Sequence, residues 1–503
     1  MDPLTSTWLL PLGALLSSFV AGIVIFFLGE QRQRLRTALN LAAALAKLGF
    51  VGLMLHGVFH GQVYELRLPL LPGNDLLLRA DTLAMLFVAL SAALWLLTTV
   101  YAIGYLEGAP HRSRFFGFFS LCVTATVGIA LAGNLVTFFL FYELLTLSTY
   151  PLVVHRGTPK SLAAGARYLA YTLGGGAALL AGIVWLQAVA GTVEFTEGGA
   201  LAALDAGRHW MLAPIFALLV AGAGVKAALV PLHGWLPQAM VAPAPVSALL
   251  HAVAVVKAGA FGIVRVVYDV FGIEFAQELG LLAPLAAVAA VTILYGSLRA
   301  LTQDDLKRRL AYSTVSQVSY IVLGVALFGP LGSIGGLVHL VHQGVMKITL
   351  FFCAGNYAET LGVHKVSEMD GVGRRMPWTT AAFTVGALGM IGVPPVAGFV
   401  SKWYLGLGAL DAGMAWVLAV LMASSLLNAA YFLPILRRAW FGEPPSRWPD
   451  EHIAVRRGWE TSGALLLPAT LAAAASLAMG IGAGAPLSPF DWAQLIVARE
   501  YLR

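Results

Sequence analysis

The feature that most constrains this chain is a series of apolar runs, each about as long as a membrane-spanning helix. A helix needs roughly 20 predominantly apolar residues to cross the hydrocarbon core of a bilayer. About fourteen such runs fit into the 503 residues, and only 11% of all residues are charged. A soluble domain typically has about 25% charged residues. The pattern therefore predicts an all-α polytopic membrane protein and excludes a soluble enzyme, a disordered chain and a nucleic-acid binder.

Polar or Gly/Pro breaks separate the runs, and some breaks are as short as Gly133-Asn134 or Gly329-Pro330. Hydropathy and spacing place fourteen expected helix centres along the chain, near Leu15, Leu45, Leu94, Val123, Leu145, Leu180, Leu218, Val255, Val288, Val318, Leu350, Leu388, Val420 and Leu471. The start, Met1-Asp2-Pro3, lacks the basic segment of a cleaved signal, so we expect the first run to be a retained helix.

Basic residues are concentrated in every second loop, as expected for a chain that crosses the membrane fourteen times. Counted in chain order, the odd-numbered loops hold twenty Lys and Arg: Arg32, Arg34, Arg36, Arg112, Arg114, Arg156, Lys160, Arg167, Arg299, Lys307, Arg308, Arg309, Lys365, Arg374, Arg375, Arg437, Arg438, Arg447, Arg456 and Arg457. The even-numbered loops hold three: Arg67, Arg79 and Arg208. Since cytoplasmic loops are enriched in Lys and Arg, we expect odd loops in the cytoplasm and both termini outside a bacterial inner membrane. The same rule explains the net charge of +6 without a nucleic-acid partner.

No sequence pattern points to a cofactor or a resident metal. The two cysteines, Cys122 and Cys353, both lie in apolar runs, and the chain has no phosphate loop, CxxC or His-Glu-x-x-His. His339 and His342 have the i, i+3 spacing of metal ligands, but no carboxylate or cysteine lies near them in the sequence. We therefore expect no redox or hydrolytic site in this chain itself.

Charged residues inside the apolar runs are the strongest functional signal. Each costs about 2.5–3.5 kcal/mol on insertion scales, so a purely structural bundle has little reason to contain several. Seven charged residues lie within or beside the predicted helices: Lys47, Glu143, Lys226, Lys257, Arg265, Lys347 and Lys402. A row of ionisable groups in a membrane interior is typical of an ion pathway.

Glu143 and Lys226 are predicted to form a switchable pair. Burial penalises both charged forms, and each charge stabilises the other. When the two separate, the lysine releases its proton more readily. Pro231 follows Lys226 and predicts a break in its helix, which is a feature of transporter sites. The alternatives are a structural ion pair for Glu143 and a snorkelling side chain for Lys226.

Three further lysines and two histidines extend this row. His251 and Lys257 are six residues apart, about 9 Å along a helix, which one or two water molecules can bridge. His339 and Lys347 lie eight residues apart on one helix face, with Gln343 between them. For the histidines the alternative is hydrogen bonding within the core or between helices.

Lys402 follows a second break, at Pro394-Pro395, which echoes the break after Lys226. Arg265 lies near a helix end and is expected to snorkel or to pair with Asp269, four residues later. For Lys47 the sequence leaves a peripheral structural role and a pathway role equally open.

Several motifs, in this order, resemble the antiporter-like membrane subunits shared by Mrp-type cation/proton antiporters and respiratory complex I. They are Phe141-Tyr142-Glu143-Leu144-Leu145-Thr146-Leu147, Val225-Lys226-Ala227 with Pro231-Leu232-His233-Gly234-Trp235-Leu236-Pro237, the run from Ala242 to His251, Asp304-Asp305-Leu306-Lys307-Arg308-Arg309-Leu310-Ala311-Tyr312-Ser313, and Gly392-Val393-Pro394-Pro395 through Lys402. The resemblance covers nearly the whole chain, and helix eleven looks most like the Mrp D-type branch.

This resemblance implies fourteen core helices with two inverted five-helix repeats and broken helices seven and twelve. The implied units are residues 1–112, the repeats 113–272 and 273–440, and residues 441–503. The family's glutamate and its four lysines fall on Glu143, Lys226, Lys257, Lys347 and Lys402. The family often has histidine where Gln343 stands, and an amide orients water but does not carry a proton.

The sequence thus predicts a proton-translocating subunit of a multi-subunit monovalent cation/proton antiporter, with Na⁺ as the expected cation. Protons would pass along Glu143, Lys226, His251, Lys257, His339, Lys347 and Lys402 with intervening water. Other hydrophobic subunits and the bilayer are the expected partners. The alternative is the proton-pumping module of a redox complex, such as complex I or a membrane-bound hydrogenase, where the chain would be part of a translocase.

Overall fold

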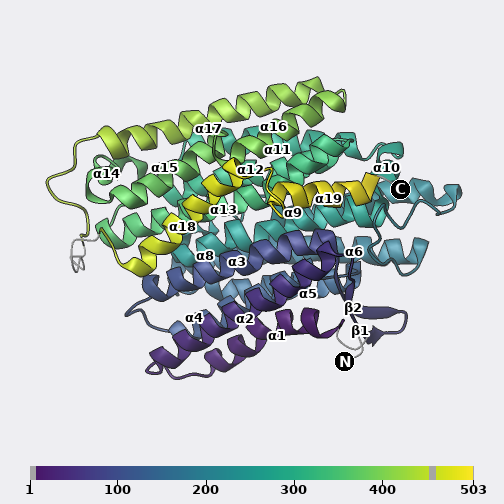
Figure 1. The fold of residues 1–503 in the computed structure, drawn as a ribbon, viewed down its shortest axis with the longest axis horizontal. Helices are drawn as coiled ribbons and strands as arrows, with labels where there is room; N and C mark the ends of the chain where they lie inside the picture. The colour runs from purple at the N-terminus through teal and green to yellow at the C-terminus, as the bar shows by residue number, and fades with distance from the viewer. Residues whose placement is uncertain (1–6, 452–459, 502–503) are drawn as a thin grey trace.

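In the computed structural model the chain is a bundle of long helices, with described residues 7–451 and 460–501 (Figure 1). Helices α1 (Leu9–Phe26) and α2 (Gln33–Phe59) form one edge of the bundle, and α17 (Ala415–Phe441) forms the opposite edge. The sequence features assigned to Met1-Asp2-Pro3, Arg456 and Arg457 lie outside the described residues.

The remaining elements follow the expected order. The first half contains β1 (Tyr64–Leu71), β2 (Asn74–Ala80), α3 (Thr82–Tyr105), α4 (Arg112–Ala130), α5 (Leu135–Val153), α6 (Pro159–Ala190), a 3₁₀ turn (Ala206–Met211), α7 (Leu212–Ala227), a second 3₁₀ turn (Ala239–Val241) and α8 (Ala244–Ala248). The chain continues with η4 (Leu249–Val253), α9 (Val255–Arg265), η5 (Val266–Phe271), α10 (Ile273–Glu278), α11 (Leu282–Leu301), α12 (Leu306–Ala326), α13 (Pro330–Leu361), a 3₁₀ turn (Val366–Glu368), α14 (Val372–Arg375), α15 (Pro377–Ile391), α16 (Ala397–Asp411), α18 (Gly463–Ile481) and α19 (Pro489–Tyr501).

Twelve helical segments of the described chain are long and apolar enough to cross a membrane. Two more segments stand at the other expected positions, α12 and the pair α15–α16. Helix α12 has a polar composition, yet its Ser, Thr and Gln side chains from Ser313 to Ser319 are buried by neighbouring helices. A helix enclosed by protein does not need an apolar surface. With these two segments the membrane fold agrees with the fourteen predicted crossings.

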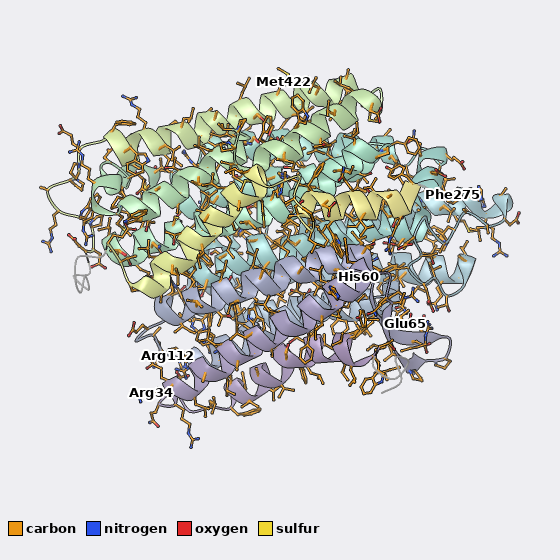
Figure 2. The ribbon with its side chains drawn as sticks, in the orientation of Figure 1. Arg34, His60, Glu65, Arg112, Phe275 and Met422 are labelled. Carbon is orange, nitrogen blue, oxygen red and sulfur yellow. The ribbon has the colours of Figure 1, made fainter. Side chains whose placement is uncertain are left out.

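Charged residues mark the two ends of the bundle (Figure 2). Arg34 and Arg112 lie at one end, and His60, Glu65 and Phe275 lie at the other. The odd-numbered loops that carry Arg34 and Arg112 therefore lie at one end, opposite the even-numbered loop that carries Glu65. This separation supports the helix count, because one additional or missing crossing would mix the two sets of loops.

Both predicted helix breaks are present. Helix α7 ends at Ala227, where Ala228 adopts a left-handed conformation with φ 58°, and the following residues up to Gln238 form no regular helix. Helix α15 ends at Ile391, where Gly392 has φ 97°, and α16 begins only at Ala397. Proline has no N–H to donate, which favours a helix end at each of these segments, although single prolines such as Pro434 are tolerated inside other helices of the bundle.

The segment containing His251 and Lys257 differs from the single regular helix that the sequence suggested. His251 lies in the π-helical turn η4, and Lys257 lies in α9, beyond a kink at Ala254 with φ −115° and ψ −84°. A second π-helical turn, η5, ends the segment. The six-residue separation therefore does not translate into the 9 Å of a straight helix, because the wider turns change both rise and direction.

Two further elements were not predicted from the sequence. Strands β1 and β2 form an antiparallel hairpin in which Tyr64 is opposite Ala80. Helix α19 packs along α13 and α3, where the Trp492 indole donates a 2.8 Å hydrogen bond to the Thr82 carbonyl. The hydropathy pattern detects apolar segments of about 20 residues. Both elements are shorter than that.

Candidate functional site

The predicted pathway residues come together inside the bundle. Three lysines and two histidines of the row have no exposed surface: Lys226, Lys257, Lys347, His251 and His339. Lys402 and Glu143 are half-buried. Five segments carry these side chains, namely α5, α7, the α8–η5 segment, α13 and α16. All residues in the most apolar parts of the α8–η5 segment and of α13 are buried, so the row passes through the centre of the protein.

Lys226 lies in the last turn of α7 and contacts α5. Its ammonium donates a hydrogen bond to the Tyr142 carbonyl and lies 3.2 Å from the centroid of the Tyr142 ring. Glu143 is the next residue, and its charge interacts with that of Lys226. However, no hydrogen bond or ion pair within 4.0 Å joins the two side chains, and Glu143 Oε1 is buried without a hydrogen-bond partner. The Glu143 carboxylate and the Lys226 ammonium are thus close in space but form no direct hydrogen bond or ion pair.

Small residues make this arrangement possible. A Cβ atom at Gly259 would collide with the backbone of Lys226 and Ala227, so the glycine allows α9 to lie directly against the end of α7. In the same way, a Cβ atom at Gly176 of α6 would collide with the Glu143 carboxylate. Lys257 lies two residues before Gly259, and side chains two residues apart on a helix point to different faces, so Lys257 is directed away from this contact.

Lys257 connects the first half of the row to α13. Its ammonium donates a 2.7 Å hydrogen bond to the Leu340 carbonyl, beside His339. His251 packs its ring 4.6 Å from the ring of Phe351, and neither of its ring nitrogens has a protein partner. The charges of Lys257 and His251 both interact with that of Lys347. Lys257 of α9 thus contacts α13, the helix that carries Lys347.

A continuous series of hydrogen bonds leads from Lys347 toward Lys402. Lys347 donates a 2.8 Å bond to the Ser313 hydroxyl of α12. The Tyr431 hydroxyl of α17 lies 3.0 Å from Ser313 Oγ and 2.6 Å from Asn428 Oδ1. The Asn428 amide donates a 3.0 Å bond to the Met390 carbonyl, which also accepts a 2.9 Å bond from Lys402. We call these six residues the Lys347–Lys402 link.

The break between α15 and α16 explains the position of Lys402. In an unbroken helix the carbonyls of Met390 and Ile391 would accept hydrogen bonds from residues 394 and 395, but both are prolines. Lys402 supplies the missing donors, with bonds of 2.9 Å to each carbonyl. A cation is favourable at this helix end because the carbonyl ends carry partial negative charge.

Buried polar groups without protein partners accompany the row. His339 Nδ1 lies 2.8 Å from Ser401 Oγ, but its Nε2 has no partner. The side-chain nitrogens and oxygens of His342, Gln343 and Gln317 also have none. Buried polar atoms are normally satisfied by protein or ordered water, so these groups favour a hydrated seam along α12 and α13. Among the described residues no group of three or more His, Cys, Asp or Glu suits a metal ion.

The sequence missed the uncharged members of this site. Ser425, Asn428 and Tyr431 follow at intervals of three residues on α17, and all three contact the Lys347–Lys402 link or Lys402 directly. Their spacing on one face of an otherwise apolar run was a usable signal. Their partners on α12 and α15, however, become evident only in the packed structure.

Lys47 and Arg265 are buried cations that lie outside the row. Lys47 donates a 2.6 Å hydrogen bond to Ser18 Oγ and lies 5.0 Å from the Trp95 ring centroid. Arg265 forms ion pairs of 3.0 Å with Asp269 and 2.9 Å with Asp81. The predicted pairing of Arg265 with Asp269 is confirmed, and Asp81 is a second partner that the sequence analysis did not identify.

Removing this guanidinium should destabilise the fold. Arg265→Met leaves the nearly buried carboxylate of Asp269 without its cation, and breaking a buried pair costs about 3–5 kcal/mol. We expect the midpoint of thermal unfolding, followed by tryptophan fluorescence in detergent, to fall by several degrees. Arg67→Met is the control, because Arg67 pairs with three carboxylates while 42% exposed, and such surface pairs contribute about 0–1 kcal/mol. Equal shifts in the two variants would contradict the expectation.

This geometry agrees with comparisons to known proteins. Residues 132–428 match the family described as "NADH:quinone oxidoreductase/Mrp antiporter, TM". The chain belongs to this family. An NADH-quinone oxidoreductase subunit of Desulforudis audaxviator, of the N type, is 40% identical over 369 residues, 72% of each chain. A Na(+)/H(+) antiporter subunit of Bacillus subtilis, of the D type, is 27% identical over 472 residues, 93% of each chain.

The fold comparison covers the entire chain. A chain in the structure of the Mrp complex from Dietzia sp. DQ12-45-1b superposes with a TM-score of 0.86 at 26% identity, covering 100% of this chain and 98% of that one. The family and the all-helical, polytopic membrane fold expected from the sequence are therefore confirmed. The relatives include both antiporter subunits and redox-complex subunits, so the family alone does not distinguish the two energy sources.

Proposed function

We propose that this chain is the proton-translocating subunit of a multi-subunit monovalent cation/proton antiporter, of the Mrp D type, exchanging protons for a cation such as Na⁺. Protons move along Glu143, Lys226, Lys257, Lys347 and Lys402, with His251, His339 and bound water between them. A change in charge at one lysine alters the proton affinity of the next through electrostatics.

The observation that carries this proposal is the Lys347–Lys402 link. It joins the buried Lys347 to the half-buried Lys402 on another helix through side chains and one carbonyl at hydrogen-bond distance. The Asn428 amide and the Met390 carbonyl position the two lysines and the water beside them, and that water carries the proton past these two groups. A structural ion pair would place each lysine beside a carboxylate, yet none of Lys257, Lys347 and Lys402 has an acidic partner among the described ion pairs. Buried ammonium groups held only by neutral acceptors can change protonation with little rearrangement.

The expected architecture forms part of the proposal. Residues 113–272 and 273–440 are the two inverted repeats, and the broken segments at α7 and at α15–α16 occupy the fourth crossing of each. Residues 1–112 and 441–503 flank them. The end of the bundle with Arg34 and Arg112 faces the cytoplasm, and both termini lie outside a bacterial inner membrane.

A redox-driven proton pump is the second candidate, supported by the 40% identity to an NADH-quinone oxidoreductase subunit. The same residues would move protons, and electron transfer in partner subunits would supply the energy. The difference between the two candidates therefore lies in the partner subunits.

Purification of the intact complex through a tag on this chain distinguishes the candidates. We expect several small hydrophobic partner subunits, and we expect a Na⁺ gradient imposed across proteoliposomes to drive proton flux, followed with a pH-sensitive dye. Co-purifying iron–sulfur subunits, together with proton uptake that requires an electron donor and a quinone, would instead establish the redox candidate.

A further inference from the structure

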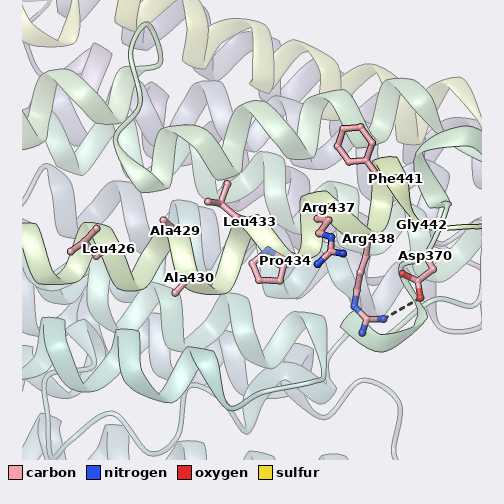
Figure 3. Close-up of a pocket in the computed structure, with 10 residues that line it drawn as sticks. All are labelled: Asp370, Leu426, Ala429, Ala430, Leu433, Pro434, Arg437, Arg438, Phe441 and Gly442. Atoms are coloured by element: carbon pink, nitrogen blue, oxygen red, sulfur yellow. Dashed lines mark hydrogen bonds and ion pairs between the residues drawn. The ribbon is translucent and has the colours of Figure 1, made fainter.

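A hollow on the outer face of α17 lies apart from the candidate pathway (Figure 3). It encloses about 930 Å³. Its apolar wall consists of Leu426, Ala429, Ala430 and Leu433, with the small alanines between two exposed leucines. Leu426 is 71% exposed and Leu433 is 50% exposed. We call this hollow the α17 groove.

The polar residues of the α17 groove gather at one end. Figure 3 shows Arg437, Arg438 and Asp370 together, with Leu426 at the far end of the same helix. Arg438 forms a 3.1 Å ion pair with Asp370 and donates a hydrogen bond to the Ser367 carbonyl. Arg437 is exposed and has no hydrogen bond or ion pair within the described part of the chain. One guanidinium is thus fixed, and the other remains free to bind an anion.

The apolar part of the α17 groove, from Leu426 to the first arginine, matches one leaflet of a bilayer in length, and the lining continues past the arginines to Phe441 and Gly442. Leu426 and Arg437 are eleven residues apart, which is about 16 Å at roughly 1.5 Å per residue. Half of a hydrocarbon core of about 30 Å is about 15 Å. Arg437 therefore lies near the phosphate level when Leu426 lies near the bilayer midplane.

We propose that the α17 groove binds one anionic phospholipid. An acyl chain lies along the leucines and alanines, and the phosphate accepts hydrogen bonds from Arg437. A guanidinium binds phosphate oxygens in a bidentate manner, and basic pockets beside transmembrane helices on the cytoplasmic side are suited to anionic lipid headgroups. This proposal does not depend on which ion the complex transports.

Photolabelling of the intact complex tests the proposal. The probe is phosphatidylglycerol with a diazirine in its acyl chain, and chymotryptic peptides are analysed by mass spectrometry. We expect labelling of the segment from Leu426 to Leu433, competed by unlabelled phosphatidylglycerol and not by phosphatidylcholine. Arg437→Gln should reduce this labelling at least about fivefold, because the phosphate loses its charged donor.

Arg34→Gln is the matched control. Arg34 is also an exposed arginine at the same end of the bundle, but it lies at the opposite edge (Figure 2). Its removal should leave labelling of the α17 groove unchanged. Equal labelling by a phosphatidylcholine probe, or unchanged labelling of Arg437→Gln, would overturn the proposal. So would protection of the segment from both probes together with cross-links to a neighbouring subunit, which would identify a protein as the occupant.

Discussion

Replacing Lys226 by alanine is expected to abolish proton transport by the reconstituted complex while the subunit still assembles. Lys226 has no exposed surface, and it is the cation between Glu143 on α5 and the closely packed α9. A positioned proton-transfer group contributes about 10²–10⁴-fold to a rate, so we expect at least about a 10²-fold loss. The measurement is cation-driven acidification of proteoliposomes, with the assembled complex quantified by native gel.

Glu143→Ala is expected to produce the same loss, because the carboxylate is the charge that stabilises the protonated lysine. Lys226→Arg tests proton release separately from positive charge. A guanidinium keeps the charge but remains protonated in proteins. This variant should assemble and also fail to transport. Lys160→Ala removes an exposed lysine at the start of α6 and should transport normally. Normal transport by Lys226→Ala or by Glu143→Ala would contradict the relay.

The charged members of the candidate site could be proposed from the sequence because each departs from the apolar pattern around it. Lys347 stands in a run of apolar residues, and its charge alone identifies it as unusual there. Helix breaks were predictable in part, because prolines such as Pro231 and Pro394 remove hydrogen-bond donors. Pro434 lies inside the continuous helix α17, however, so a proline alone does not determine a break.

Contacts between helices were not predictable from one sequence. The Lys257 ammonium binds a backbone carbonyl at Leu340, and every residue has such a carbonyl, so no side-chain pattern indicates the partner. The π-helical turn at His251 likewise has no signature that hydropathy detects. Glu143 and Lys226 were expected as a pair, but no local pattern distinguishes a bonded pair from neighbours that lie apart.

Removing one hydroxyl from the Lys347–Lys402 link should slow transport without changing the fold. Tyr431 has no exposed surface, and Tyr431→Phe retains its ring. The variant loses the contacts to Ser313 and Asn428, at 3.0 Å and 2.6 Å. Water can partly replace a lost hydroxyl in a hydrated seam, so we expect a loss of about tenfold, smaller than that for Lys226→Ala. The measurement is the initial rate of proton flux in proteoliposomes.

Tyr357→Phe is the matched control for this prediction. Tyr357 is equally buried, and its hydroxyl donates a 3.1 Å hydrogen bond to Thr380, outside the Lys347–Lys402 link. Tyr431→Phe loses two hydrogen-bond contacts and Tyr357→Phe loses one. At a typical cost of about 1 kcal/mol for each bond, the stabilities of the two variants should differ by no more than about 1 kcal/mol. Only Tyr431→Phe should slow proton flux. Equal rates in the two variants would mean that protons reach Lys402 without this link, because a general packing defect would affect both proteins alike.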